Sequence, residues 1–251
     1  NADIIYEIYK LSWRGEAFAG LRPAPDDGAL EHWVRKQPGL SLFLNHRVNA
    51  ATKKGSRVVS VKARNIETSH ELVFKGKFFA DCTGDGTVGF MVGAEYRSGS
   101  ESRAETDEML APEEGGMKYM GTSNLWTTRW VQKEIAFPSC PWALPITEES
   151  LNCTSSDREV SKQRGEPYVV CWNWESGFFR DQIKDAEWIR DHNFRAAYGT
   201  WDYLKNKSTN RSYYAKAEMT WLAYVSGKRE SRRLMGDYVL TEHDLTQNRT
   251  S

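Results

Sequence analysis

The chain has 251 residues, of which 39% are hydrophobic and 27% are charged, and its 34 Lys and Arg residues balance its 34 Asp and Glu residues. A zero net charge lacks the basic bias of nucleic-acid-binding domains, so no nucleic acid is expected as a partner. No apolar run approaches the ~20 residues that a helix needs to span a bilayer, so no transmembrane segment is expected. The length suits one large domain or two small ones.

The first 100 residues are predicted to form a helix, a β-meander and a further strand that leads into a second helix. Apolar spacing predicts the first helix over residues 29–36, stopped by Gln37, Pro38 and Gly39. The predicted strands and turns follow in order: a strand over 40–48, a hairpin turn over 53–56, a strand over 57–64, a turn over 67–70, a hairpin strand from residue 71, and a strand ending near Cys82.

The rest of the chain is less regular. Residues 101–167 are loop-like, apart from a strand within 122–132, and Pro141 and Pro145 exclude a long element there. A strand over 167–174 precedes a turn at Ser176 and Gly177. The strongest helical periodicity covers residues 180–205, and a second helix is expected over 213–224.

The cysteine and histidine residues give no metal-binding pattern. The four cysteines, Cys82, Cys140, Cys153 and Cys171, include no CxxC spacing, and the five histidines fit neither a zinc motif nor a catalytic triad. No metal site is therefore predicted. Cys82, at the end of an apolar run, is expected to be a buried thiol, and two disulfides remain an alternative if the protein is exported.

A glycine-rich acidic turn, Thr83-Gly84-Asp85-Gly86, separates the predicted strand from the following helix. Glycine lets the backbone approach a ligand closely, and N–H groups at the start of a helix suit a phosphate or a polarised oxygen. An ordinary strand-to-helix connection with an Asp near the helix start explains the same residues. Spacing alone leaves both interpretations open.

A second charged motif, KRESRR, covers residues 228–233. Arg229 and Arg232 are expected to share one side of a turn or helix, with Glu230 and Arg233 on another. Guanidinium groups bind carboxylates in a bidentate manner and stabilise anionic groups. A solvated charge cluster, or an internal Arg–Glu pair, is the structural alternative.

The segment VVCWNWESGFF places Trp172, Trp174 and Glu175 before Gly177. If this segment faces a substrate, the aromatic rings would exclude water and Glu175 would accept or donate a proton. The alternative is the edge of a core, because Trp in a strand usually packs.

These motifs resemble the FAD-dependent oxidoreductase family of glutathione-reductase-like flavoproteins. FFADCTGDG and GAEYRSG are similar to the family's D-A-T-G-D-like turn and A-G-A-x-Y-R-x-G, with Cys82 in place of the usual Ala, and RESRR followed by GDYVLT is similar to a later motif. The resemblance implies an α/β fold, mixed α+β in this piece. A partial FAD/NAD(P)-binding Rossmann-like domain with an inserted β-meander would cover residues 1–100, and a mixed-sheet and helical substrate domain would cover residues 101–251.

The resemblance also implies FAD as cofactor and assigns residues to its site. The cofactor-binding residues would be Val48, Cys82, Thr83, Gly84, Asp85 and Gly86, with the Val48 backbone beside the adenine; Val48 is equally well explained as an ordinary strand residue. Arg229, Arg232 and Glu175 are the candidates for catalysis.

The chain departs from the family at both ends. It lacks the G-x-G-x-x-G segment with its later acidic residue, and the closing flavin segment. We therefore expect a fragment that is inactive and binds FAD poorly when isolated. Its full-length parent would transfer hydride or electrons from a small-molecule substrate, anionic or polyhydroxylated. The alternative is a non-catalytic carbohydrate-binding module. Oligomeric state and compartment, cytoplasmic or exported, stay open.

Overall fold

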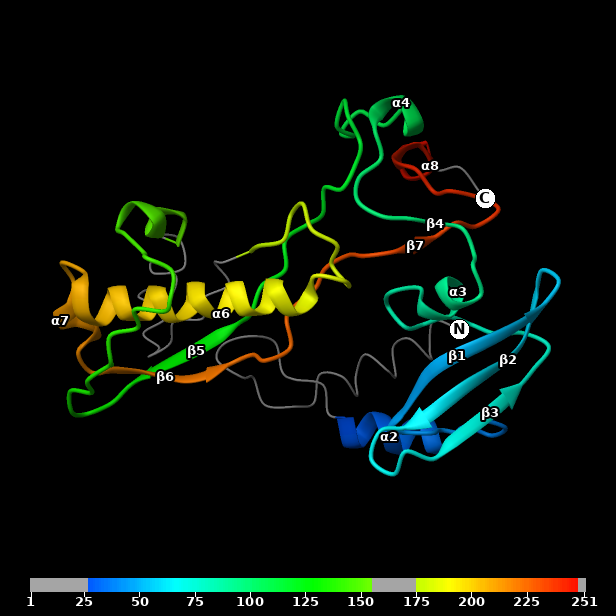
Figure 1. Ribbon diagram of the computed structural model, residues 1–251, viewed down its shortest axis with the longest axis horizontal. Helices are drawn as coiled ribbons and strands as arrows, with labels where there is room; N and C mark the ends of the chain where they lie inside the picture. The colour runs from blue at the N-terminus through cyan, green and yellow to red at the C-terminus, as the bar shows by residue number, and fades with distance from the viewer. Residues whose placement is uncertain (1–26, 155–174, 248–251) are drawn as a thin grey trace. The chain divides into compact units, whose positions relative to one another are not determined.

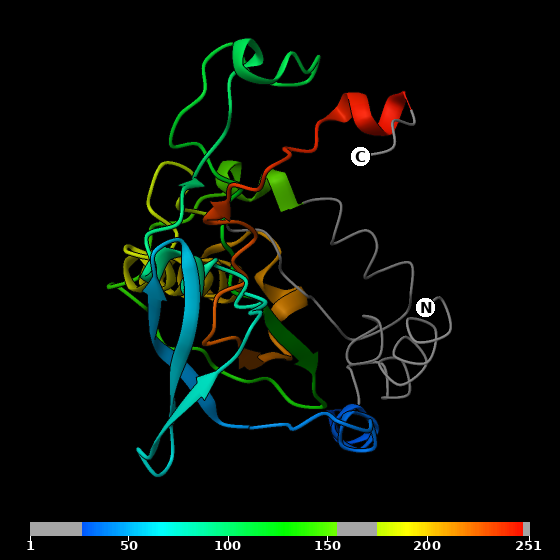
Figure 2. The same cartoon turned by 90° about the vertical axis from the view of Figure 1, so that its right-hand side faces the viewer.

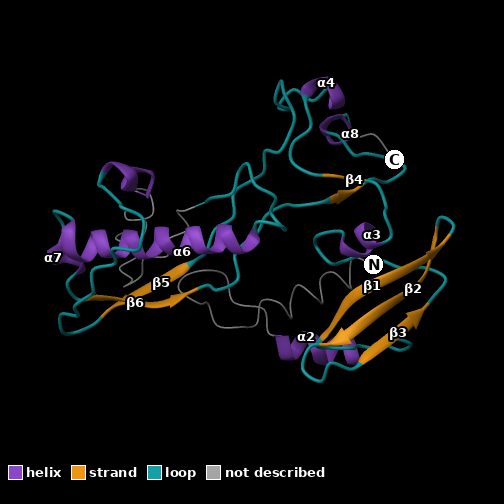
Figure 3. Cartoon of the chain, viewed as in Figure 1, coloured by secondary structure: helices purple, strands orange, loops and turns teal. Residues whose placement is uncertain are grey.

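The computed structural model describes residues 27–154 and 175–247, which form one long helix, several short helices and small sheets joined by loops (Figure 1, Figure 3). The chain divides into two compact units, Asn1–Ala80 and Asp81–Ser251. The mixed helix and strand content agrees with the predicted α/β class. All three sheets of the described residues are antiparallel, so the Rossmann-like sheet stays a prediction. So does the domain boundary near residue 100.

The first unit contains helix α2 and a three-stranded meander. Helix α2, Asp27–Arg35, confirms the predicted helix. The meander has strands β1 (His46–Lys54), β2 (Arg57–Asn65) and β3 (Glu71–Lys75) in the order β1-β2-β3 (Figure 1, Figure 2). Gly55, at φ +62°, makes the predicted turn between β1 and β2, because this left-handed conformation suits glycine. Ala63 is the buried residue of the sheet and pairs with Val48 and Leu72.

Two predicted strands of this region differ from the structure. The first strand begins at His46 rather than at residue 40, because Asn45 takes a left-handed φ of +57° that interrupts an extended chain. Residues 77–82 form no strand, since no strand within the described ranges supplies them with hydrogen-bond partners. An apolar sequence becomes a strand only where a neighbouring backbone pairs with it.

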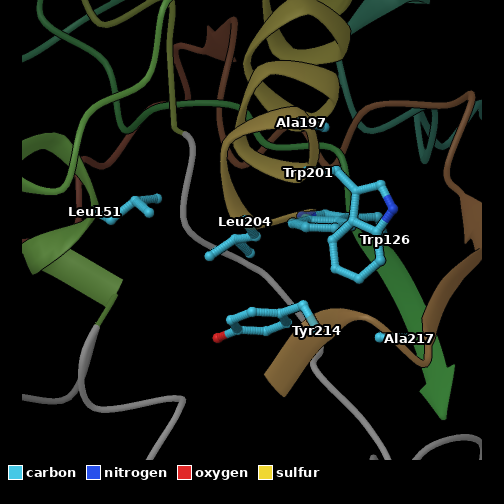
Figure 4. Packing of buried hydrophobic residues seen from close by; sticks show 7 residues of the cluster. All are labelled: Trp126, Leu151, Ala197, Trp201, Leu204, Tyr214 and Ala217. Carbon is cyan, nitrogen blue, oxygen red and sulfur yellow. The ribbon is translucent and has the colours of Figure 1, made fainter. Parts of the chain in front are cut away.

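The second unit is built around one long helix and a two-stranded ribbon. Helix α6 (Ala186–Asp202) continues into the π-helical turn η2 (Tyr203–Lys207), and strands β5 (Trp126–Trp130) and β6 (Ala217–Leu222) pair antiparallel. The predicted strand within 122–132 is confirmed. The core cluster consists of Trp126, Leu151, Ala197, Trp201, Leu204, Tyr214 and Ala217 (Figure 4). Within it, the rings of Trp126 and Trp201 meet edge to face, with centroids 5.5 Å apart.

A buried cation closes the end of this core. Lys205 is 9% exposed, and its Nζ donates hydrogen bonds of 2.8–2.9 Å to the carbonyl oxygens of Tyr214, Ala215 and Ala217. Burial lowers the pKa of Lys205 below its ordinary value. The ammonium therefore supplies donors to three carbonyls where the chain passes from a helical turn into β6.

Two helix predictions of this unit need correction. The helix predicted over 180–205 begins at Ala186, because the Asp181 carboxylate accepts the N–H groups of Ile183 and Lys184 in a preceding turn. The helix predicted over 213–224 is wrong. Helix α7 covers Arg211–Tyr214, and the chain then enters β6. Pairing of β6 with β5, from Ala217 opposite Trp130 to Leu222 opposite Trp126, overrides the weak helical period.

Short elements complete the second unit: α3 (Thr87–Met91), β4 (Tyr96–Arg97), α4 (Arg103–Thr106), the 3₁₀ turn η1 (Glu149–Thr154), β7 (Arg233–Leu234) and α8 (Glu242–Thr246). Strand β4 pairs antiparallel with β7.

No helix in the described part of the chain is long and apolar enough to cross a bilayer. The strand predicted over 167–174 lies outside the described residues.

Candidate functional site

The 83–86 turn, Thr83-Gly84-Asp85-Gly86, is shaped by the carboxylate of Asp81. Its Oδ1 accepts hydrogen bonds from the Thr83 amide (3.1 Å) and the Thr83 hydroxyl (2.7 Å), and its Oδ2 accepts one from the Gly89 amide (3.0 Å). Burial alone would raise the pKa of Asp81, but these hydrogen bonds outweigh it and the pKa is lowered. Asp81 therefore stays ionised and fixes the entry and exit of the turn.

The glycines serve two different purposes. A Cβ at Gly86 would lie 2.9 Å from Leu234 Cγ, and a Cβ at Gly89 would lie 2.5 Å from both methyl carbons of Leu234, so these two glycines make room for β7. Gly84 has a φ of +79°, and a Cβ there would meet no atom within 4 Å. Gly84 is therefore required by backbone conformation, and its outer side is open to a ligand.

The backbone of the 83–86 turn also provides hydrogen-bond donors. The amide groups of Gly84, Asp85 and Gly86 donate no hydrogen bond to any residue in the described ranges. Successive unpaired N–H groups in a turn with left-handed residues suit a phosphate or a ligand oxygen. The helix that follows, α3, has only five residues, so it adds little of the dipole expected from the sequence.

Asp85 joins this turn to the 228–233 segment. Its carboxylate accepts Lys228 Nζ at 2.5 Å on Oδ1 and 2.6 Å on Oδ2, and Ser231 Oγ at 2.5 Å on Oδ1. Its carbonyl oxygen accepts Arg232 Nε at 2.9 Å. Burial alone would raise the pKa of Asp85, but the hydrogen bonds from Lys228 and Ser231 prevail and the pKa is lowered. Two motifs that resemble one family thus meet at one carboxylate.

The other charges of the 228–233 segment bind different parts of the second unit. Arg229 Nη1 lies 2.9 Å from Glu175 Oε1, and Glu230 accepts the Met120 amide. Arg233 Nη2 donates to the Gly99 carbonyl at 2.6 Å and pairs with Glu101 at 2.7 Å. The segment has no helical residues, so Arg229 and Arg232 do not share a helix face and instead reach separate partners.

Arg232 differs from its neighbours because, across the described ranges, no carboxylate lies within ion-pair distance of it. Its guanidinium carbon lies 4.0 Å from the centre of the Phe90 ring and 5.9 Å from that of Tyr96. It also lines a cavity of about 310 Å³, together with Phe90, Tyr96, Ser98, Tyr119, Asp181, Gln182, Ile183, Lys184 and Ser231. An aromatic face and a carbonyl therefore orient this cation at the cavity wall.

A buried polar network supports the chain beside Glu175. The backbones of Thr122 and Ser176 exchange hydrogen bonds of 2.9 and 3.1 Å. Asn193, 2% exposed, donates to the Thr122 carbonyl at 2.8 Å and accepts from Ser176 Oγ at 2.6 Å. Gln182 accepts from Thr122 Oγ1 at 2.6 Å. With every partner engaged, this network holds Glu175 in position next to Arg229.

The structure brings some predicted site residues together and leaves others apart. Asp85 contacts Arg232, and Glu175 pairs with Arg229. Thr83, Gly84 and Gly86 belong to the same turn as Asp85. Val48 lies in β1 of the first unit, where it pairs with Ala63, so its assignment to the adenine stays a prediction. Trp172 and Trp174 lie outside the described residues.

The prediction for the Cys82 thiol is wrong. Cys82 is exposed and lies outside any strand, because residues 77–82 have no pairing partner in the described sheets. Cys140 is instead buried, and burial raises the pKa of its thiol. No cluster of His, Cys, Asp or Glu side chains that could hold a metal occurs in residues 27–154 and 175–247.

Sequence reasoning missed several residues of the site. Lys228 and Ser231 were visible in the KRESRR motif, but nothing in the sequence indicated that both bind Asp85. Phe90 and Tyr119 gave no signal, because an aromatic residue in a short helix or a loop is most often a packing residue. Their role at the cavity wall depends on contacts across more than 100 positions of sequence, such as Phe90 with Arg232.

The residues present fit part of an FAD site. The open side of Gly84 and the unpaired N–H groups of the turn suit a phosphate or ribityl oxygen, whereas the Asp85 carboxylate already accepts three hydrogen bonds from Lys228 and Ser231. We therefore expect the backbone of the turn, rather than the Asp85 side chain, to contact the cofactor.

Comparison with known proteins gives the family. No curated protein and no solved structure matches the chain. The sequence model of the family described as FAD dependent oxidoreductase matches residues 23–251. The match covers most of the chain and includes both the 83–86 turn and the 228–233 segment. The chain therefore belongs to the FAD-dependent oxidoreductase family, whose cofactor is FAD.

Proposed function

We propose that this protein oxidises or reduces a small polar molecule with FAD, and that the 83–86 turn and the 228–233 segment form the protein side of that site. The observation that carries the proposal is the junction at Asp85, where Lys228 and Ser231 bind the carboxylate and Arg232 binds the carbonyl. This junction connects a turn suited to the cofactor with arginines suited to a substrate.

When bound, FAD accepts or donates two electrons, and the protein supplies positioning and electrostatics. Arg232 presents a fixed positive charge at the cavity wall, which would orient an anionic or polyhydroxylated substrate. Glu175, bound to Arg229 at 2.9 Å, would accept the proton released when the substrate is oxidised. Arg229 would hold this carboxylate in a fixed orientation.

The proposal is tested first by flavin content. The protein, expressed with any flanking sequence that its gene encodes, should purify yellow with about one FAD per chain, and FAD should raise the melting temperature of the flavin-depleted form. A colourless protein that FAD does not stabilise would contradict the proposal and favour a non-catalytic carbohydrate-binding module.

A matched pair of variants tests the role of the turn. Gly84 and Gly55 both have positive φ, +79° and +62°, and a Cβ at either would meet no atom within 4 Å. The Gly84→Ala and Gly55→Ala variants therefore carry a similar backbone strain, about 1–2 kcal/mol. Only Gly84→Ala should weaken FAD binding, measured by titrating the flavin-depleted protein. Equal FAD affinity in the two variants would remove the turn from the cofactor site.

A further inference from the structure

The cavity beside Arg232 has the features of a binding site for a small carboxylate. We propose that the substrate of this protein is a small organic acid whose carboxylate binds Arg232 and the hydroxyl of Tyr119. This inference rests on the proposed function, because it names the substrate class of that site. The cavity, at about 310 Å³, lies at the lower end of the roughly 300–1,000 Å³ range of ligand pockets, so the acid is small.

The first argument is the state of Arg232. In the 228–233 segment, Lys228, Arg229 and Arg233 each pair with a carboxylate, whereas Arg232 uses Nε on the Asp85 carbonyl and stacks over Phe90. Its two terminal nitrogens make no hydrogen bond to the described residues. Because the planar guanidinium binds a carboxylate with two parallel hydrogen bonds, an anchored Arg with free terminal donors is suited to an external carboxylate.

The second argument is Tyr119. Its side chain lines the cavity and the residue is 7% exposed, yet its hydroxyl has no hydrogen-bond partner within the described ranges. The only side-chain atom in the described residues that is fully buried without a partner is Ser100 Oγ, so the Tyr119 hydroxyl is not fully buried and can accept a further partner. A hydroxyl without a protein partner, on a residue that lines a cavity, can donate a hydrogen bond to a ligand oxygen.

The third argument is the charge of the wall. Among the described residues, Arg232 and Lys184 are the cations that line the cavity, and Asp181 is the one carboxylate. Hydrogen bonds from the Lys184 and Ile183 amides outweigh the opposing effect of burial and lower the pKa of Asp181, so this carboxylate is ionised. The wall therefore carries one excess positive charge, which favours a monoanion over a neutral sugar.

Calorimetric titration of the FAD-loaded protein with four acids, acetate, glycolate, lactate and gluconate, tests the inference, with acetamide and glucitol as neutral controls. At least one acid should bind with saturation, and the neutral molecules should not. The Arg232→Gln variant should bind that acid at least about tenfold more weakly, and Tyr119→Phe about threefold more weakly. Arg129→Gln, which alters an arginine of β5 outside the cavity, should bind it as the unchanged protein does.

Because Arg232 also binds the Asp85 carbonyl, Arg232→Lys serves as a second variant that retains the charge. It should fold, as judged by its melting temperature, and still lose part of the affinity, since the lysine lacks the two-nitrogen fork. A yellow protein that binds none of the four acids, or binds them unchanged in Arg232→Gln and Arg232→Lys, overturns the inference and leaves the proposed function intact. A colourless protein that FAD does not stabilise overturns the proposed function itself.

Discussion

The Asp85 carboxylate and the Lys228 ammonium are separated by 143 positions in sequence and form an ion pair, with Nζ 2.6 Å from Oδ2. Ser231 binds the same carboxylate and is itself 6% exposed. This half-buried pair links the 83–86 turn to the 228–233 segment. The shape of the turn therefore depends on a segment near the other end of the chain.

Replacing Asp85 with Asn should destabilise the protein. The amide keeps the size of the side chain but leaves the Lys228 ammonium without its counter-charge, so the free energy of unfolding should fall by about 1–2 kcal/mol. Urea denaturation measures this change. Asp237→Asn, at an exposed position, serves as the control and should change stability by less than about 0.5 kcal/mol. Equal effects of the two variants would show that the Asp85–Lys228 pair contributes nothing.

Stability should fall at acid pH, and Asp85 should account for part of this loss. The pKa of Asp85 is lowered from its ordinary value of 3.8 in the folded chain, so below that value the unfolded chain binds more protons than the folded chain. The stabilisation is present above the unfolded pKa and is lost as pH falls through the folded pKa. The stability difference between the unchanged protein and Asp85→Asn should therefore stay constant above about pH 5 and shrink as pH falls below about 4. A difference that stays constant with pH would contradict this assignment.

Gly89 should not tolerate a methyl group while Leu234 is present. The added Cβ would lie 2.5 Å from both Leu234 methyl carbons, so the Leu234 side chain would have to rotate away and lose its packing on Gly89. Gly89→Ala should lower the melting temperature, at a cost of about 1 kcal/mol, although alanine favours helices. In a Leu234→Ala background the same substitution should be neutral or stabilising. A loss of the same size in both backgrounds would exclude the steric explanation.

Lys205→Met should destabilise the second unit. Methionine fills much of the same space, but the carbonyls of Tyr214, Ala215 and Ala217 lose their donor, which should lower the free energy of unfolding by about 2–3 kcal/mol. Thermal denaturation compared with Lys216→Met, an exposed lysine of the same region, measures the effect. If the two variants melt alike, the three hydrogen bonds of Lys205 do not stabilise the fold.

Local patterns in the sequence predict those elements whose shape depends on near neighbours. The β1–β2 hairpin and helix α2 follow from alternation, spacing and the turn residues beside them. The helix expected over 213–224 fails because β5, about 90 positions away, pairs with that segment as β6. The strand predicted to end near Cys82 is absent for the opposite reason: no strand of the described sheets pairs with residues 77–82. Whether an apolar segment has such a partner cannot be read from the local sequence.

For the candidate site too, the sequence predicts the local motifs but not the contacts between distant segments. The motifs containing Asp85, Arg229 and Arg232 can be recognised in the amino-acid sequence, and the resemblance to a family identifies them. Which charge binds which partner depends on the path of the whole chain. Arg229 reaches Glu175 and Arg233 reaches Glu101, although both arginines belong to one run of six residues. Tyr119, on a loop without any motif, becomes visible only when the cavity is known.

Each of the six residues of the 228–233 segment makes a hydrogen bond, and their partners in order are the Asp85 carboxylate, Glu175, the Met120 amide, the Asp85 carboxylate again, the Asp85 carbonyl and Glu101. Inserting or deleting one residue there would offset the whole series by one position and set charges of the wrong sign, or neutral groups, against each carboxylate. No single substitution elsewhere would repair all of these mismatches together. The length of this segment, more than any one of its side chains, therefore keeps these contacts aligned with their partners.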